Sequence, residues 1–156
     1  NKYTDVKDIP ENGTIAVPND ATNESRALYL LESAGLIKLD VKGNELATVA
    51  NIKENKKNLT ISELDASQTP ASLTSADAAV VNNTFVREAG IDYKKALFKE
   101  EANENSKQWY NLIAAKPDWK KSDKADAIEK IIKAYHTDEV KKVIEESSDG
   151  MDQPVW

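Results

Sequence analysis

The 156-residue sequence contains no cysteine and only one histidine, His136. These absences exclude disulfides, thiolate chemistry and zinc–thiolate sites, and they leave little material for the usual nucleophile–base pairs of enzymes. The sequence also has no glycine-rich phosphate loop, no His-Glu-x-x-His motif and no Gly-x-Ser-x-Gly motif. We therefore expect a protein that is not an enzyme and that uses neither a metal ion nor a cofactor.

The sequence also has fewer positively charged residues than negatively charged ones. The chain has 21 Lys and Arg residues against 27 Asp and Glu residues, a net charge of −6, which argues against a nucleic-acid partner. Adjacent acids such as Glu100 and Glu101 are interpreted as solvated surface residues. No apolar run approaches the length of a membrane span, and no signal peptide opens the chain. The composition, 40% hydrophobic and 31% charged, is typical of a globular chain with its own core.

Residues 15–36 form the stretch around which the rest of the chain is organised. Residues 15–17 predict the end of a buried strand, because Pro18 cannot donate to a sheet ladder. A dense cluster of turn and capping residues follows, and a helix is predicted from Glu24 to Gly35. The order is strand, polar loop and helix N-terminus, which is the junction where open α/β sheets bind ligands.

Further strands and helices alternate along the chain. Three short apolar segments are predicted to be strands, at residues 59–64, 78–81 and 109–114. The second of these should be a central strand, buried on both faces. Two amphipathic helices are predicted near the end, one from Ser122 and one that follows a Thr137 cap and stops at Gly150. This pattern predicts an α/β fold with a mostly parallel sheet flanked by helices.

Arg26 lies in the first turn of the helix predicted from Glu24, where a cation opposes the helix dipole. It is either a solvated surface arginine or a residue with a negative group beside it. The free amide donors of a first helical turn and the fork of arginine donors would together suit a carboxylate. The residues alone leave both interpretations open.

Two asparagines are the other candidate ligand groups. Asn82 follows the second predicted strand, so it should emerge at the carboxyl edge of the sheet beside Arg26. Its amide can accept from an ammonium group or donate to a carboxylate of one zwitterionic ligand, and the alternative role of helix cap is assigned to Asn83. Asn111 lies inside the third predicted strand, where asparagine is disfavoured. We expect Asn111 to be either a ligand group or a member of an internal hydrogen-bond network.

The sequence resembles a known family in long stretches. Residues 17–31, which include Asn-Glu-Ser-Arg-Ala-Leu at 23–28, and residues 34–39 resemble the signature of the methionine-binding lipoproteins of bacterial ABC importers, the NlpA lipoprotein family. The resemblance continues through residues 57–73, 77–85 and 138–142. It implies a periplasmic-binding-protein-like lobe, part of a two-lobed solute-binding protein.

The resemblance also implies roles for residues. Arg26 would hold the carboxylate of an amino acid, and Asn82 and Asn111 would hold its backbone. The ligand would be L-methionine or a related amino acid or small peptide, and the protein partner would be an ABC permease. The full-length protein would be an extracytoplasmic lipoprotein, anchored in the cell membrane by a lipid that this chain lacks. The alternative function is the effector-binding domain of a regulator with the same architecture.

The resemblance further implies that the chain is a fragment that begins near the crossing into the second lobe. Residues 1–115 would form this second, C-terminal lobe, and residues 116–156 would be helices that return to the missing first lobe. The apolar surface left uncovered makes self-association an expectation. The chain departs from the family pattern at Ser25, where glycine is frequent, and at residues 107–110. Both places border the supposed cleft.

Overall fold

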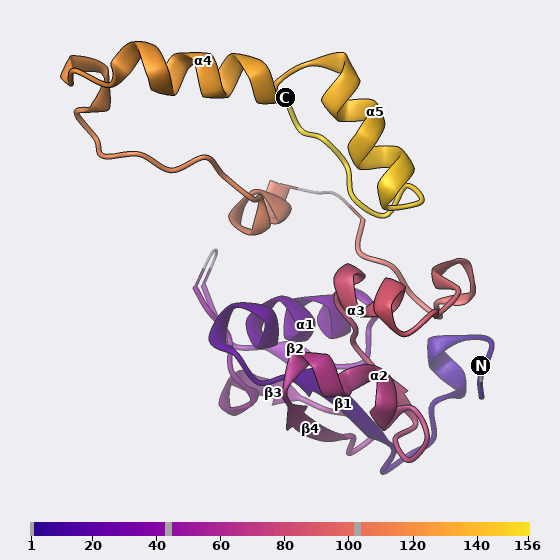
Figure 1. The fold of residues 1–156 in the computed structure, drawn as a ribbon. Helices are drawn as coiled ribbons and strands as arrows, with labels where there is room; N and C mark the ends of the chain where they lie inside the picture. Colours follow the sequence, from indigo (N-terminus) through magenta and orange to yellow (C-terminus); the bar gives the residue numbers. More distant parts are fainter. Residues whose placement is uncertain (1, 43–44, 102–103) are drawn as a thin grey trace. The chain divides into compact units, whose positions relative to one another are not determined.

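The computed structural model describes residues 2–42, 45–101 and 104–156. The chain forms two compact units, Asn1–Trp109 and Tyr110–Trp156 (Figure 1). Strands and helices alternate in the first unit, whereas the described elements of the second unit are all helical. The division falls close to the lobe boundary expected at residue 115, although the assignment of the units to lobes stays a prediction.

The strand β1 (Thr14–Pro18) is the centre of a parallel three-stranded sheet. It pairs with β4 (Thr60–Leu64) on one side and with β5 (Ala78–Ala79) on the other. Residues 15–17 of β1 are at most 1% exposed, as expected for an apolar strand with neighbours on both sides. The predicted α/β fold with a parallel sheet flanked by helices is therefore confirmed.

The helix α1 (Ala21–Ser33) follows β1 and packs against it (Figure 1). It begins three residues before the predicted start at Glu24, because the Asp20 side chain accepts the backbone N–H of Asn23 at 3.1 Å and caps the helix. Gly35 follows its end with φ +75°, a left-handed conformation that glycine adopts without strain. The core face of the helix consists of Ala27, Leu28 and Leu31.

The other elements of the first unit are short. The α-helices are α2 (Thr69–Ser72) and α3 (Asn83–Glu88), and an antiparallel ribbon joins β2 (Lys38–Leu39) to β3 (Ile52–Glu54). The 3₁₀ helices are η1 (Val6–Asp8), η2 (Val49–Asn51), η3 (Ala66–Gln68), η4 (Tyr93–Lys95) and η5 (Glu104–Trp109).

Two strand predictions are wrong. The segment 78–81 gives the two-residue strand β5 at the edge of the described sheet, not a central strand, because β1 takes the middle position. Residues 110–114 form no strand, although their apolar character favoured one, because they have no strand partner in the described chain. Hydrophobic pattern alone does not supply the neighbouring ladder on which a strand depends.

The second unit contains η6 (Trp119–Lys121), α4 (Ala125–Tyr135) and α5 (Asp138–Ser147). The predicted cap of α5 is confirmed, since Thr137 Oγ1 accepts the N–H of Val140 at 3.2 Å. The α4 helix begins at Ala125, three residues after the predicted start at Ser122. No residue of either α-helix is buried, and Ile131, Tyr135 and Val143 on their surfaces are exposed. Within the described ranges, no helix has the length and apolar character that a membrane crossing requires.

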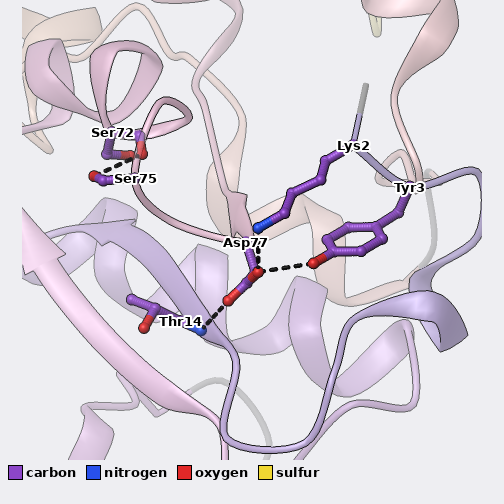
Figure 2. A network of polar contacts seen from close by, with 6 residues as sticks. All are labelled: Lys2, Tyr3, Thr14, Ser72, Ser75 and Asp77. Atoms are coloured by element: carbon purple, nitrogen blue, oxygen red, sulfur yellow. Dashed lines mark hydrogen bonds and ion pairs between the residues drawn. The ribbon is translucent and has the colours of Figure 1, made fainter.

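Asp77 ties the N-terminal residues to the sheet (Figure 2). Its Oδ1 accepts from Lys2 Nζ at 2.7 Å and from the Tyr3 hydroxyl at 2.8 Å, and its Oδ2 accepts from the Thr14 N–H at 2.9 Å. The ammonium of Lys2, followed by the Thr14 and Tyr3 donors, lowers the pKa of Asp77 from 3.8 to about 2. One carboxylate therefore joins the residues before η1, the start of β1 and the start of β5.

This pKa gives stability a defined pH dependence. Because folding depresses the pKa of Asp77, its contribution is complete above about pH 3.8 and is lost as the pH falls towards about 2. Asp77→Asn should lower the Tm at neutral pH, and the Tm difference from the unmodified chain should shrink on acidification. Circular dichroism melts across this pH range measure the difference, with exposed Asp123→Asn as control. A Tm difference that does not change with pH would contradict this role.

Candidate functional site

The carboxyl ends of β1 and β5 lead into polar segments that meet at the start of α1. Because β1 lies between its two neighbours, the chain moves to one side of it for β4 and to the other side for β5. A reversal of strand order of this kind marks the ligand crevice of open α/β sheets, outside the carboxyl ends of the strands. The residues at these two ends therefore define the candidate site.

A chain of hydrogen bonds links the two strand ends. Asn82, after β5, donates from Nδ2 to Asn23 Oδ1 at 2.9 Å. Asn23 donates from its own Nδ2 to the two carboxylate oxygens of Asp20, at 3.1 and 3.0 Å. An ionised carboxylate can only accept, so Asp20 fixes the orientation of the Asn23 amide, which in turn fixes that of Asn82. The Asn82 amide therefore keeps its carbonyl oxygen as an acceptor for another group.

That carbonyl oxygen is the least satisfied atom at the site. Asn82 Oδ1 is buried and has no hydrogen-bond partner within the described part of the chain. A buried acceptor without a donor costs about 1–3 kcal/mol, so its presence points to a donor that comes from elsewhere. Asn82 also occupies the N-cap position of α3, which was expected of Asn83, but its side chain makes no capping hydrogen bond. The Asn82 amide nitrogen thus donates to Asn23, and the amide oxygen remains available to accept a hydrogen bond.

Arg26 lies beside this network on α1. It is the sixth residue of the helix, in the second turn and not in the predicted first turn, because Asp20 starts the helix earlier. The expected negative group is Glu100, whose Oε2 lies 2.7 Å from both Nε and Nη2 of Arg26. The interpretation of Glu100 as merely solvated is therefore wrong. The side chains keep 40% and 30% of their surface exposed, so the pair remains accessible to solvent.

The helix brings two of the three candidate residues to one face. Asn23 and Arg26 are three positions apart on α1, which makes their side chains neighbours on the helix surface. Since Asn82 bonds to Asn23, it approaches the same face one turn before Arg26. Asn111 is exposed and outside any strand, and it belongs to the unit Tyr110–Trp156. Within the first unit, Asn23 links Asn82 to the helix that carries Arg26.

A small pocket adjoins Arg26 along α1. Its volume is about 110 Å³, below the roughly 300–1,000 Å³ of typical ligand pockets. The Tyr29 and Trp109 rings lie 6.3 Å apart in it, between centroids. It is lined by Arg26, Tyr29, Leu30, Glu32, Ser33, Glu100, Ser106, Gln108 and Trp109. This volume suits part of a small-molecule site. The residues that the structure describes contain no cluster of three or more acidic or histidine side chains able to hold a metal ion.

Polar residues missed by the sequence analysis hold α1 in place. Glu24 and Ser25 are buried in the helix, although their polar character alone favours an exposed position. Three hydrogen bonds tie the segment 45–49 along α1: Val49 N–H to Glu24 Oε1 at 3.0 Å, Ala47 N–H to Ser25 Oγ at 2.9 Å and the Tyr29 hydroxyl to the Glu45 carbonyl at 2.9 Å. The one indication of this role in the sequence was Ser25, which places a hydroxyl group where the family that the sequence resembles often has glycine.

The comparison with family models identifies the family. The model described as NlpA lipoprotein matches residues 1–156. The chain belongs to the NlpA lipoprotein family. The family predicted from the stretches around Arg26 and Asn82 is therefore confirmed.

Curated relatives agree with this family. The D-methionine-binding lipoprotein MetQ of Escherichia coli K12 is 38% identical over 142 residues, which are 89% of this chain and 50% of the relative. Outer membrane lipoprotein 1 of Mannheimia haemolytica is 40% identical over 139 residues, 89% of this chain and 48% of the relative. The chain thus spans about half the length of the curated relatives it matches.

Solved structures share the fold. The substrate binding protein of a methionine transporter from Streptococcus pneumoniae is 79% identical with a TM-score of 0.87, and the match covers 100% of this chain and 60% of that one. A nutrient binding protein from Burkholderia cenocepacia bound to methionine is 34% identical with a TM-score of 0.71, over 96% and 61% of the two chains. These relatives of the NlpA lipoprotein family are named as binding proteins, and the periplasmic-binding-protein-like fold is confirmed.

The hydrogen bond between Ser25 and Ala47 should stabilise the helix that carries Arg26. Ser25→Ala would leave the buried Ala47 N–H without an acceptor, so the free energy of unfolding should fall by about 1–3 kcal/mol. Urea denaturation measures this change. Ser33→Ala, at an exposed serine of the same helix, should alter the unfolding free energy far less. Equal effects of the two substitutions would argue against the role of Ser25.

Proposed function

We propose that the chain is a ligand-holding lobe of a solute-binding lipoprotein of an ABC importer, and that it binds methionine or a related amino acid or small peptide without breaking a bond. The observation that carries this proposal is the hydrogen bond that ties Asn82, with its open acceptor, to Asn23, three positions before Arg26 on α1. Relatives that are named for methionine binding support the ligand class.

The two side chains complement the two charges of an amino acid. Arg26 offers a guanidinium fork, which matches a carboxylate with two parallel hydrogen bonds. Asn82 Oδ1 accepts, so it suits the ammonium group that every free amino acid carries. Asn111 is proposed as a further contact to the amino-acid backbone on the family resemblance alone. The apolar side chain of the ligand would be enclosed mainly by a facing lobe.

The remaining features of the proposal concern the whole protein. Residues 1–115 would form the second lobe, and residues 116–156 would return to a first lobe. Ligand binding would close the two lobes, and the closed form would dock on an ABC permease. The full-length protein would be extracytoplasmic and lipid-anchored, as its family relatives are named lipoproteins.

Binding of methionine should depend on Arg26 and Asn82. The chain should bind L-methionine and D-methionine weakly, because a 110 Å³ pocket cannot enclose the ligand. Arg26→Ala should remove detectable binding, and Asn82→Ala should weaken it about tenfold, the effect of losing one hydrogen bond to a charged group. An NMR titration measures these affinities. Arg87→Ala and Asn83→Ala, on α3, are the matched controls.

Two outcomes would contradict this proposal. Unchanged affinity for methionine in Arg26→Ala would show that Arg26 does not bind the ligand carboxylate. Equally tight binding by this chain and by a protein in which it is joined to a first lobe would contradict a site divided between two lobes.

Self-association should accompany the exposed apolar surface. Ile131, Tyr135 and Val143 on α4 and α5 are 59%, 47% and 61% exposed, although each is a large side chain on an amphipathic helix. The chain should therefore form dimers or larger species as its concentration rises. Analytical ultracentrifugation measures the mass, and Ile131→Glu should shift the equilibrium to the monomer. A monomer at every concentration would refute this expectation.

A further inference from the structure

The contact between Arg26 and Glu100 uses only one edge of the guanidinium. A single carboxylate oxygen, Glu100 Oε2, accepts from Nε at 2.7 Å and lies 2.7 Å from Nη2 in the same ion pair. Arginine carries five N–H donors in a fixed plane, and the edge that faces Glu100 holds two of them, on Nε and Nη2. The end-on fork of the same group consists of one N–H of Nη1 and the other N–H of Nη2. That fork is the edge that can take a second carboxylate with two parallel hydrogen bonds.

Residues before and after Glu100 in the sequence pack within the first unit. Leu97, three residues earlier, packs against the hydrophobic core of the first unit. Ser106 is buried, and the Trp109 ring lies 6.3 Å from the Tyr29 ring of α1. The contact between Trp109 and Tyr29 lies on the stripe of α1 that also carries Arg26.

We propose that Glu100 is a positioning residue for carboxylate recognition: it fixes the side edge of Arg26 and thereby presents the end-on fork to the ligand. This role rests on the proposed function, in which Arg26 binds the carboxylate of an amino acid. A long side chain that is already ordered loses less conformational freedom on binding, so the bound state forms more readily. Glu100 need not contact the ligand itself.

The negative charge of Glu100 acts in the opposite direction, because it repels a ligand carboxylate. Both side chains are partly exposed, so water and salt screen this repulsion, whereas the geometric effect on the guanidinium is not screened. The two effects predict opposite signs when Glu100 is removed. Weaker binding indicates positioning, and tighter binding indicates that Glu100 competes with the ligand.

The test is an NMR titration of the 156-residue chain with L-methionine, since this method measures even millimolar affinities. Glu100→Ala should raise the dissociation constant about three- to tenfold, the effect of having to order a free arginine side chain on binding. Glu100→Gln should have a smaller effect, because its amide oxygen still accepts. In the absence of ligand, the Arg26 Nε–H resonance should shift in both Glu100→Ala and Glu100→Gln. Glu63→Gln, at an exposed glutamate of β4, should leave the affinity unchanged.

A further arm separates positioning from a general structural effect. The loss in Glu100→Ala should disappear in an Arg26→Lys background, which keeps the positive charge but lacks the planar fork. Tighter binding of methionine by Glu100→Ala, or the same loss in the Arg26→Lys background, would overturn the positioning role. Failure of the unmodified chain to bind methionine would instead refute the proposed function, and this role with it.

Discussion

The hydrogen bond from Asn82 to Asn23 is the contact on which the candidate site depends. It joins the segment that leaves β5 to the helix that leaves β1, so two regions 59 residues apart in sequence act as one surface. Asp20 sets its direction, because a carboxylate that only accepts forces the amide of Asn23 to present its oxygen to Asn82. This bond thus ties Asn82 directly to the helix that carries Arg26.

Much of the fold around this contact could be predicted from local sequence. The apolar run before Pro18 and the cluster of capping residues after it predicted β1 and α1, since both signals come from neighbouring residues. The start of α1 was missed because several residues in the loop are able to cap, and only the structure shows that Asp20 does so. The segment 109–114 has the composition of a strand, but a strand needs a partner, which composition does not specify.

The candidate site was predictable only in part, for a related reason. Arg26 and Asn82 became candidates because each lies in the segment that follows a predicted strand, and the family resemblance implied their roles. Glu100 was not found, because 74 residues separate it from Arg26 and its charged surroundings are typical of solvated surface. The pattern did indicate that Arg26 needed a negative neighbour, without indicating which one. The role of Asn82 as a hydrogen-bond partner of Asn23 likewise depends on a tertiary contact, which no spacing rule contains.

The open acceptor of Asn82 has a consequence for the protein when it holds no ligand. An oxygen that is buried without a donor makes the empty state less stable than it would be with that oxygen satisfied. Anything that supplies the donor and binds only the folded chain shifts the folding equilibrium towards the native state. The Tm should therefore rise when a ligand binds at this site. Melting curves recorded with a panel of small cationic and zwitterionic metabolites can then show which of them bind.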